Sequence, residues 1–201
     1  MATLFENISK EFLLENITPR TEKSSQWFKN KLQLMSGINR QELLLSPEFK
    51  QRGQLIVQRP LIGTMHMFKY LPKGEETLPY YDQYPLVIIT GKAKDGFRGL
   101  NLHYLPVMLR VRFLALLYDV MQVSDEMDHD NELDWDRLNR GALKRFLKPM
   151  IKTYLTKQVR GRIAQVFPPE WEIAAFLPFQ RFRKSNRDIV WRDSYKQVYR
   201  R

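Results

Sequence analysis

The middle of the chain, residues 64–105, alternates short β-type runs with turns, and this pattern constrains the fold more than any other feature. Thr64–Tyr70 alternates bulky side chains, Pro85–Thr90 is largely β-branched, and Phe97–Leu105 follows a turn that contains glycine. Short runs of this kind, bounded by Pro and Gly, are typical of strands. Three strands at this spacing predict a small antiparallel sheet or partial barrel.

Helical spacing appears before and after this region. Residues 2–16 carry apolar side chains at helical intervals, and a second helix after them is expected to end near Gly37. Downstream, Pro106 can occupy the first turn of a largely apolar helix that runs to about Met121.

The pattern after this helix predicts three more elements. We expect a helix over about 135–147, a break at Pro149, and a further helix from Pro149 to about Ile163. Residues 171–177 are expected to return to the sheet as a strand. The predicted fold class is therefore α+β, with a sheet from residues 62–105 and 171–177 surrounded by helices and followed by a basic C-terminal arm.

The length of 201 residues suits one medium domain with arms. We expect an N-terminal helical segment over residues 1–60, an α+β core domain over 61–180, and the basic C-terminal arm over 181–201.

Charge is unevenly distributed along the chain. The total is +11, from 33 Lys and Arg against 22 Asp and Glu. Residues 119–136 hold eight acids and no base, residues 140–162 hold eight bases and no acid, and residues 181–201 hold eight bases and two acids. Such blocks indicate a polyanionic partner, which is either nucleic acid or an acidic protein surface.

The basic segments supply candidate contacts to DNA phosphates. The candidates are Lys144, Arg145, Lys148, Lys152, Lys157, Arg160, Arg162, Arg181, Arg183, Lys184, Arg187, Arg192, Lys196, Arg200 and Arg201. Four aromatic side chains among them can stack on frayed or single-stranded bases, namely Phe182, Trp191, Tyr195 and Tyr199. The alternative is that these aromatics pack on the protein core or on a neighbouring subunit while the bases remain solvated.

Several function classes are excluded by composition. The chain has no cysteine, which excludes disulfides, thiolate zinc sites, iron–sulfur clusters and cysteine nucleophiles. No phosphate-binding glycine loop, serine nucleophile elbow or apolar run of membrane-spanning length is present, so no membrane partner is expected. The first residues lack a signal-peptide core, which favours a reducing cytoplasm or a particle assembled there.

Histidine and carboxylate positions leave a metal site open as an alternative. His66 and His103 fall in strand candidates and Asp82 lies in the loop between them, a donor set that two-histidine, one-carboxylate sites use. We favour structural roles for both histidines and expect no metal and no cofactor. Asp128 and Asp130 in the acidic block keep a metal-dependent nuclease as the least favoured function.

Three motifs carry a family resemblance. They are G-x-M-x-x-F-x-Y, L-P-Y-Y-D-x-x-P-L-V and G-F-x-G-L-N-L-H-Y-L-P, all beginning within residues 63–105. The later segments KPMIKTYLTKQVR and EWEIAAFLPFQRFRK keep the same order and spacing. Over roughly residues 60–193 the chain resembles the DNA end protector proteins, a family of small virion structural proteins from T4-like tailed phages.

The resemblance implies a structural component of the phage virion, assembled in the host cytoplasm, with no catalytic residues. Such a protein would bind packaged double-stranded DNA ends and shield them from host exonuclease. The residues that define the family motif are Tyr80, Tyr81, Asp82, Gly99, Asn101, His103 and Tyr104. Asn101 and His103 can hydrogen-bond loop backbone, and Tyr80 with Tyr81 can cover the sheet edge.

The sequence thus predicts a non-enzymatic protein whose partners are DNA ends and other virion proteins of the portal, neck, tail or baseplate, with no small-molecule substrate. The runner-up is an assembly subunit of the neck, tail or baseplate that acts only through protein contacts. The opposite charges of neighbouring blocks suit that role, because adjacent copies can pair them.

Overall fold

The computed structural model describes residues 62–122, 143–166 and 171–199, together with positions 11, 14–16, 23, 26–27, 30 and 56–57. The helices expected before Gly37 lie mostly outside the described residues, as does most of the helix expected over 135–147. The side chains of the acidic block at 119–136 also lie outside them.

The described residues form a six-stranded antiparallel sheet with the strand order β1-β7-β2-β4-β5-β6. The strands are β1 Ile56–Val57, β2 Met65–Tyr70, β4 Leu86–Ala93, β5 Gly96–Asn101, β6 Ile151–Leu155 and β7 Val159–Val166. A second, two-stranded sheet pairs β3 Tyr81–Asp82 with β8 Phe182–Arg183. The small sheet therefore joins the loop after β2 to the segment that precedes the last helix.

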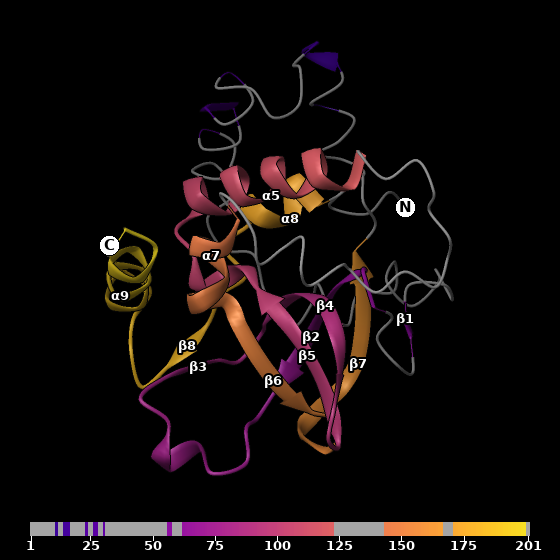
Figure 1. The fold of residues 1–201 in the computed structure, drawn as a ribbon, viewed down its shortest axis with the longest axis vertical. Helices are drawn as coiled ribbons and strands as arrows, with labels where there is room; N and C mark the ends of the chain where they lie inside the picture. Colours follow the sequence, from indigo (N-terminus) through magenta and orange to yellow (C-terminus); the bar gives the residue numbers. More distant parts are fainter. Residues whose placement is uncertain are drawn as a thin grey trace.

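Helices cover one face of the large sheet. They are α5 Val107–Gln122, α7 Lys144–Met150, α8 Trp171–Phe176 and α9 Arg187–Tyr199. Figure 1 shows α5 beside α8, α7 between this pair and β6, and α9 along the outer side of α7. No helix among the described residues has both the length and the apolar character needed to cross a bilayer.

Both faces of the sheet are apolar. Along β4, Leu86 and Ile88 belong to the large cluster shared with the helices, whereas Val87 and Ile89 belong to a second cluster. This alternation follows from the two-residue period of a strand. The second cluster is rich in aromatic rings in edge-to-face or stacked contact, from Phe68, Tyr70, Phe97 and Tyr154.

The predicted α+β class and antiparallel sheet are confirmed. The three strands expected within 64–105 correspond to β2, β4 and β5, although the end of the third forms a short 3-10 helix, η2, over Leu102–Tyr104. The helix expected from Pro106 corresponds to α5. The break expected at Pro149 is not found at that residue, because α7 includes Pro149 in its last turn and ends one residue later, at Met150.

The helix predicted from Pro149 to Ile163 is wrong. This stretch forms β6, a 3-10 turn η3 over Thr156–Gln158, and most of β7. Gly161 has a φ of 78°, which no right-handed helix contains. Pairing of β7 with β2 and of β6 with β5 decides the conformation, and neither partner is near in sequence.

The strand predicted over 171–177 is also wrong, because these residues form α8 and do not join the sheet. Trp171, Ile173, Ala174, Ala175 and Phe176 are all buried. A short apolar run that is buried on every side has no periodicity to distinguish a helix from a strand.

Candidate nucleic-acid interface

Asp82 of the motif L-P-Y-Y-D is a fully buried hydrogen-bonding hub. One of its oxygens, Oδ2, lies 2.7 Å from Nδ1 of His103 and accepts from Nδ2 of Asn101 at 3.4 Å. The other, Oδ1, accepts from the backbone amides of Tyr84 at 3.1 Å and Arg181 at 3.0 Å. Burial by itself raises the pKa of Asp82, but the charge and hydrogen bond of His103 and the two amides outweigh it and lower the pKa below 3.8.

Asn101 and His103 extend this network into the backbone. The side-chain oxygen of Asn101 accepts from the amide of His103 at 3.0 Å, which caps η2. The carbonyl of His103 accepts from Nε1 of Trp191 at 2.9 Å. Residues of the motifs L-P-Y-Y-D-x-x-P-L-V and G-F-x-G-L-N-L-H-Y-L-P therefore hold the connection between β5 and α5 against β3 and α9.

The other motif residues pack around the same network. Gly99 lies where a Cβ would collide with the Val87 side chain and come within 2.8 Å of the carbonyl oxygen of Ile88, so glycine is needed for close approach. The Tyr81 hydroxyl donates to Glu75 at 2.7 Å. The ring of Tyr80 lies 6.0 Å from that of Tyr104. All of these contacts are internal to the protein.

Arg110 joins the network from α5, and the sequence reasoning did not select it. Its side chain is fully buried and donates to the carbonyls of Leu105 at 2.7 Å, Ala175 at 3.1 Å and His103 at 3.4 Å, and to Oε1 of Gln180 at 3.4 Å. Burial lowers the pKa of Arg110 to about 9, opposed by the charge of Asp82. The available signal was one arginine on the apolar side of a helix.

The structure does not bring the two histidines into one site. His103 pairs with Asp82, whereas both ring nitrogens of His66 lie 3.4 Å from the Thr64 hydroxyl. Burial lowers the pKa of His66 to about 4, so its ring is neutral at pH 7. Among the described residues, no three His, Asp or Glu side chains lie close enough together to hold a metal ion.

Most of the candidate phosphate ligands are exposed. The exposed ones are Lys144, Lys148, Lys157, Arg160, Arg181, Arg183, Lys184, Arg187, Arg192 and Lys196. Because α7 packs against α9, the structure brings the basic residues of two separate charge blocks together on neighbouring helices. The side chain of Arg162, and all of Arg200 and Arg201, lie outside the described residues.

Besides Arg187, which forms an ion pair with Asp188 at 3.6 Å, three of the candidate cations are engaged within the described part of the protein. Lys184 donates to the carbonyls of Glu75 and Leu78, and so holds the loop after β2. The guanidinium of Arg145 is half-buried over the ring of Phe146 at 5.0 Å. The third is Lys152, which is largely buried.

The four candidate aromatics separate into two groups. Phe182 packs 5.4 Å from the ring of Tyr104, and Trp191 donates to the His103 carbonyl, so both support the fold. Tyr195 and Tyr199 are 52% and 43% exposed on α9, with ring centroids 4.4 Å apart. Of the four, Tyr195 and Tyr199 therefore offer the larger exposed ring surface for stacking.

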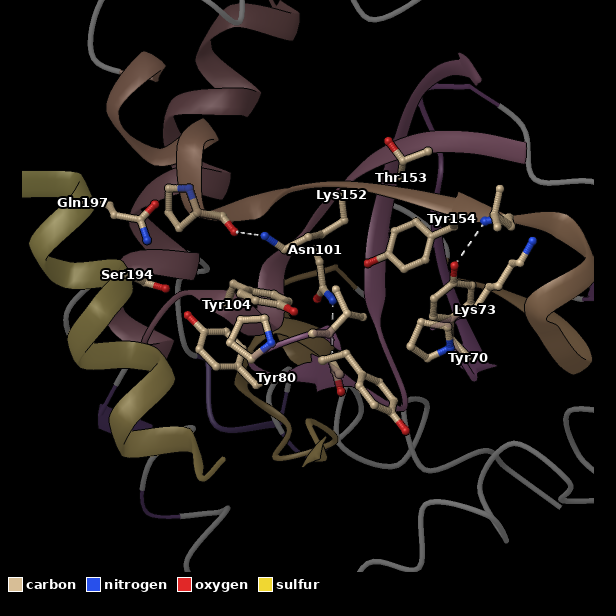
Figure 2. Close-up of a pocket in the computed structure, with 17 residues that line it drawn as sticks. Tyr70, Lys73, Tyr80, Asn101, Tyr104, Lys152, Thr153, Tyr154, Ser194 and Gln197 are labelled. Carbon is tan, nitrogen blue, oxygen red and sulfur yellow. Dashed lines mark hydrogen bonds between the residues drawn. The ribbon is translucent and has the colours of Figure 1, made fainter. Parts of the chain in front are cut away.

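A cavity of about 530 Å³ lies between α9, the small sheet and the β5–β6 edge of the large sheet. Figure 2 shows Ser194 and Gln197 of α9 on one side and Tyr70, Tyr154 and Lys73 on the other. The lining consists of residues 70, 72–73, 78–82, 149 and 152–155, with Asn101, Tyr104, Ser194 and Gln197. Five of the seven motif residues, Tyr80, Tyr81, Asp82, Asn101 and Tyr104, therefore line this cavity.

Lys152 is the largely buried cation of this cavity, whereas Lys73 is exposed. Its ammonium donates to the carbonyl of Pro149 at 2.9 Å and lies 4.1 Å from the centroid of the Tyr104 ring. Burial lowers the pKa of Lys152 to about 8, so the side chain is still mostly protonated at pH 7. Within the described part of the chain, no carboxylate lies within ion-pairing distance of it.

Comparison with known protein families matches residues 3–199 to the family described as phage T4 terminal DNA protecting protein. No curated protein and no solved structure matches the chain. The match confirms the resemblance seen in the motifs and extends it over the first 60 residues. The chain therefore belongs to the family of the phage T4 terminal DNA protecting protein.

Proposed function

We propose that this protein is a non-enzymatic component of the phage virion that binds the ends of packaged double-stranded DNA and shields them from host exonuclease. The observation that carries the proposal is the family match over residues 3–199, since the family is described by protection of terminal DNA. The exposed cations of α7 and α9 support it, because they form the kind of basic surface that phosphate binding requires.

The surface of α7 and α9 predicts how the binding responds to salt. Lys144 and Lys148 on α7, and Arg192 and Lys196 on α9, are exposed, and no described carboxylate forms an ion pair with them. Each phosphate contact that is removed changes the slope of log K against log salt by about 0.9. Removing four contacts therefore weakens binding on the order of a thousandfold near 0.15 M salt.

The test uses linear duplex DNA and closed circular DNA of the same sequence, in mobility-shift and exonuclease-protection assays at two salt concentrations. The wild-type protein should protect linear DNA. A variant with glutamine at Lys144, Lys148, Arg192 and Lys196 should lose most of its affinity and reduce the salt slope by about 3.6. The matched control places glutamine at four exposed cations elsewhere, Lys92, Lys94, Arg98 and Arg112, and should behave like the wild type.

Equal and negligible binding to both DNA forms would contradict the proposal. The protein would then be better explained as an assembly subunit of the neck, tail or baseplate, visible as a symmetric ring in images of the particle. Fragmentation of DNA in the presence of Mg²⁺ would contradict the non-enzymatic part of the proposal.

A further inference from the structure

The cavity beside α9 contains a positive charge that the described protein does not neutralise. The ammonium of Lys152 contacts one carbonyl oxygen and one aromatic face, and its side chain is mostly removed from water. A buried charge without an opposite charge is costly, whereas the same charge next to a bound anion is stabilised. The arrangement is therefore suited to an anionic ligand.

The carboxylates near the cavity do not fill this role, and Glu75 accepts from the hydroxyl of Tyr81. Asp82 lines the cavity but is held by His103, Asn101 and two backbone amides. Asp193 lies close enough to Tyr80 that its charge contributes to raising the pKa of that tyrosine, after the larger effect of burial. Lys73, which is exposed, adds a second positive charge to the lining.

The size and walls of the cavity indicate what kind of anion fits. A volume of about 530 Å³ is within the range of roughly 300–1,000 Å³ that holds one small ligand. The rings of Tyr80 and Tyr104 form one side, and Asn101, Ser194 and Gln197 supply uncharged polar groups. Exposed Lys73, Pro79 and Thr153 at the rim indicate that the cavity opens to solvent.

We propose that this cavity binds the terminal nucleotide of a DNA strand, with a phosphate at the Lys152 ammonium and the base on the side formed by Tyr80 and Tyr104. The inference rests on the proposed function, because it names the part of the DNA that the cavity takes. Aromatic stacking together with a positive charge is the usual combination for unpaired nucleotides.

The cavity can distinguish the end of a duplex from its interior, which the surface of α7 and α9 cannot do. Phosphate contacts do not distinguish an end from the middle of a duplex, since every phosphate carries the same charge. A nucleotide in the interior of a duplex must be unstacked and unpaired before it can enter a pocket, which costs free energy. A terminal nucleotide frays more easily, so a pocket of single-nucleotide size selects DNA ends.

The first experiment is photocrosslinking of the wild-type chain to a duplex that carries 5-iododeoxyuridine at its terminal position, followed by mass spectrometry. The proposal expects the adduct on Tyr80 or Tyr104. An adduct on Tyr195 or Tyr199 would refute the cavity as the binding site of the terminal nucleotide, but would still show that the protein binds DNA. Absence of any adduct, with no binding to either DNA form, would overturn the proposed function as well.

The second experiment compares the affinity for a duplex with free ends with that for a closed dumbbell of the same length. Lys152→Met should reduce the preference for free ends by about ten- to a hundredfold, the range expected for the loss of a hydrogen-bonded charge contact. Lys148→Met removes an exposed lysine from α7 and should weaken binding to both DNAs equally. An unchanged preference in a folded Lys152→Met protein would refute the inference.

Discussion

Replacement of Asp82 by asparagine should destabilise the fold strongly although the two side chains have nearly the same shape. Asp82 is the only group that bonds His103, Asn101 and the amides of Tyr84 and Arg181 at once in the described network. These partners come from β5, η2 and the segment before β8, so the carboxylate ties together regions about 100 residues apart in the sequence.

The magnitude follows from counting donors. A carboxylate accepts on both oxygens, whereas an asparagine presents one oxygen and one NH₂ group. In either orientation, the NH₂ group of asparagine takes the place of one carboxylate oxygen. The two donors that bonded to that oxygen then face another donor. Losing two hydrogen bonds to a charged group at about 1.5–3 kcal/mol each gives a cost of about 3–6 kcal/mol, which overlaps the usual cost of about 3–5 kcal/mol for breaking a buried ion pair. For a chain of this length the melting temperature should fall by roughly 6–24 °C.

Urea unfolding at pH 7, followed by circular dichroism, measures this cost. Asp95→Asn is the matched control, because Asp95 is exposed in the β4–β5 turn and its φ of 61° suits asparagine equally well. The control should change the free energy of unfolding by less than about 0.5 kcal/mol. If the two substitutions cost the same, the assignment of Asp82 as a structural hub is refuted.

The wild-type protein and the Asp82→Asn variant also give a test of pH dependence, in which the direction of the change is fixed. The folded state holds the pKa of Asp82 below its ordinary value of 3.8, so the unfolded state binds more protons in acid. The stabilisation that ionised Asp82 gives to the folded state is complete above the pKa of Asp82 in the unfolded chain. It is lost as the pH falls through the pKa of Asp82 in the folded protein. The stability difference between wild type and Asp82→Asn should therefore shrink from pH 7 to pH 3, and a difference independent of pH would contradict the charge argument.

Two further substitutions test the packing around this hub. Arg110→Met should lower the free energy of unfolding by about 3–5 kcal/mol in the same urea assay, because it leaves buried carbonyl oxygens without donors. The control is Arg112→Met on the exposed side of α5, which should change the free energy of unfolding by less than about 0.5 kcal/mol. Gly99→Ala should lower the stability measured by thermal melting by about 1–3 kcal/mol, since the added Cβ would lie 2.8 Å from the carbonyl oxygen of Ile88. A Cβ at Gly91 would meet open space, so Gly91→Ala should not show this loss of stability.

Local sequence patterns predicted the elements that depend mainly on nearby residues. The strands β2, β4 and β5 are bounded by turns, β4 and β5 are joined by a tight turn, and α5 has a long apolar pattern that begins at a proline. The motifs that carry the family resemblance lie in the same region. The charge blocks were also visible, because charge is a property of composition.

The candidate site was only partly predictable. The sequence indicated Tyr80, Tyr81, Asp82, Asn101 and Tyr104 as members of one motif set and Lys152 as a basic residue, but not that these five and Lys152 line the same cavity. The structure also separated Tyr195 and Tyr199, which are exposed, from Phe182 and Trp191, which support the fold.

What the sequence determined by itself was the α+β class, the central strands, the family motifs and the excess of positive charge. Tertiary structure decided that 151–166 forms strands, that 171–176 forms a helix, and that the basic residues of α7 and α9 lie together. The physical reason is that propensity acts over a few residues, whereas strand pairing and burial depend on partners far away in the chain. For β7 that partner is β2, more than 90 residues earlier, where Met65 pairs with Val166.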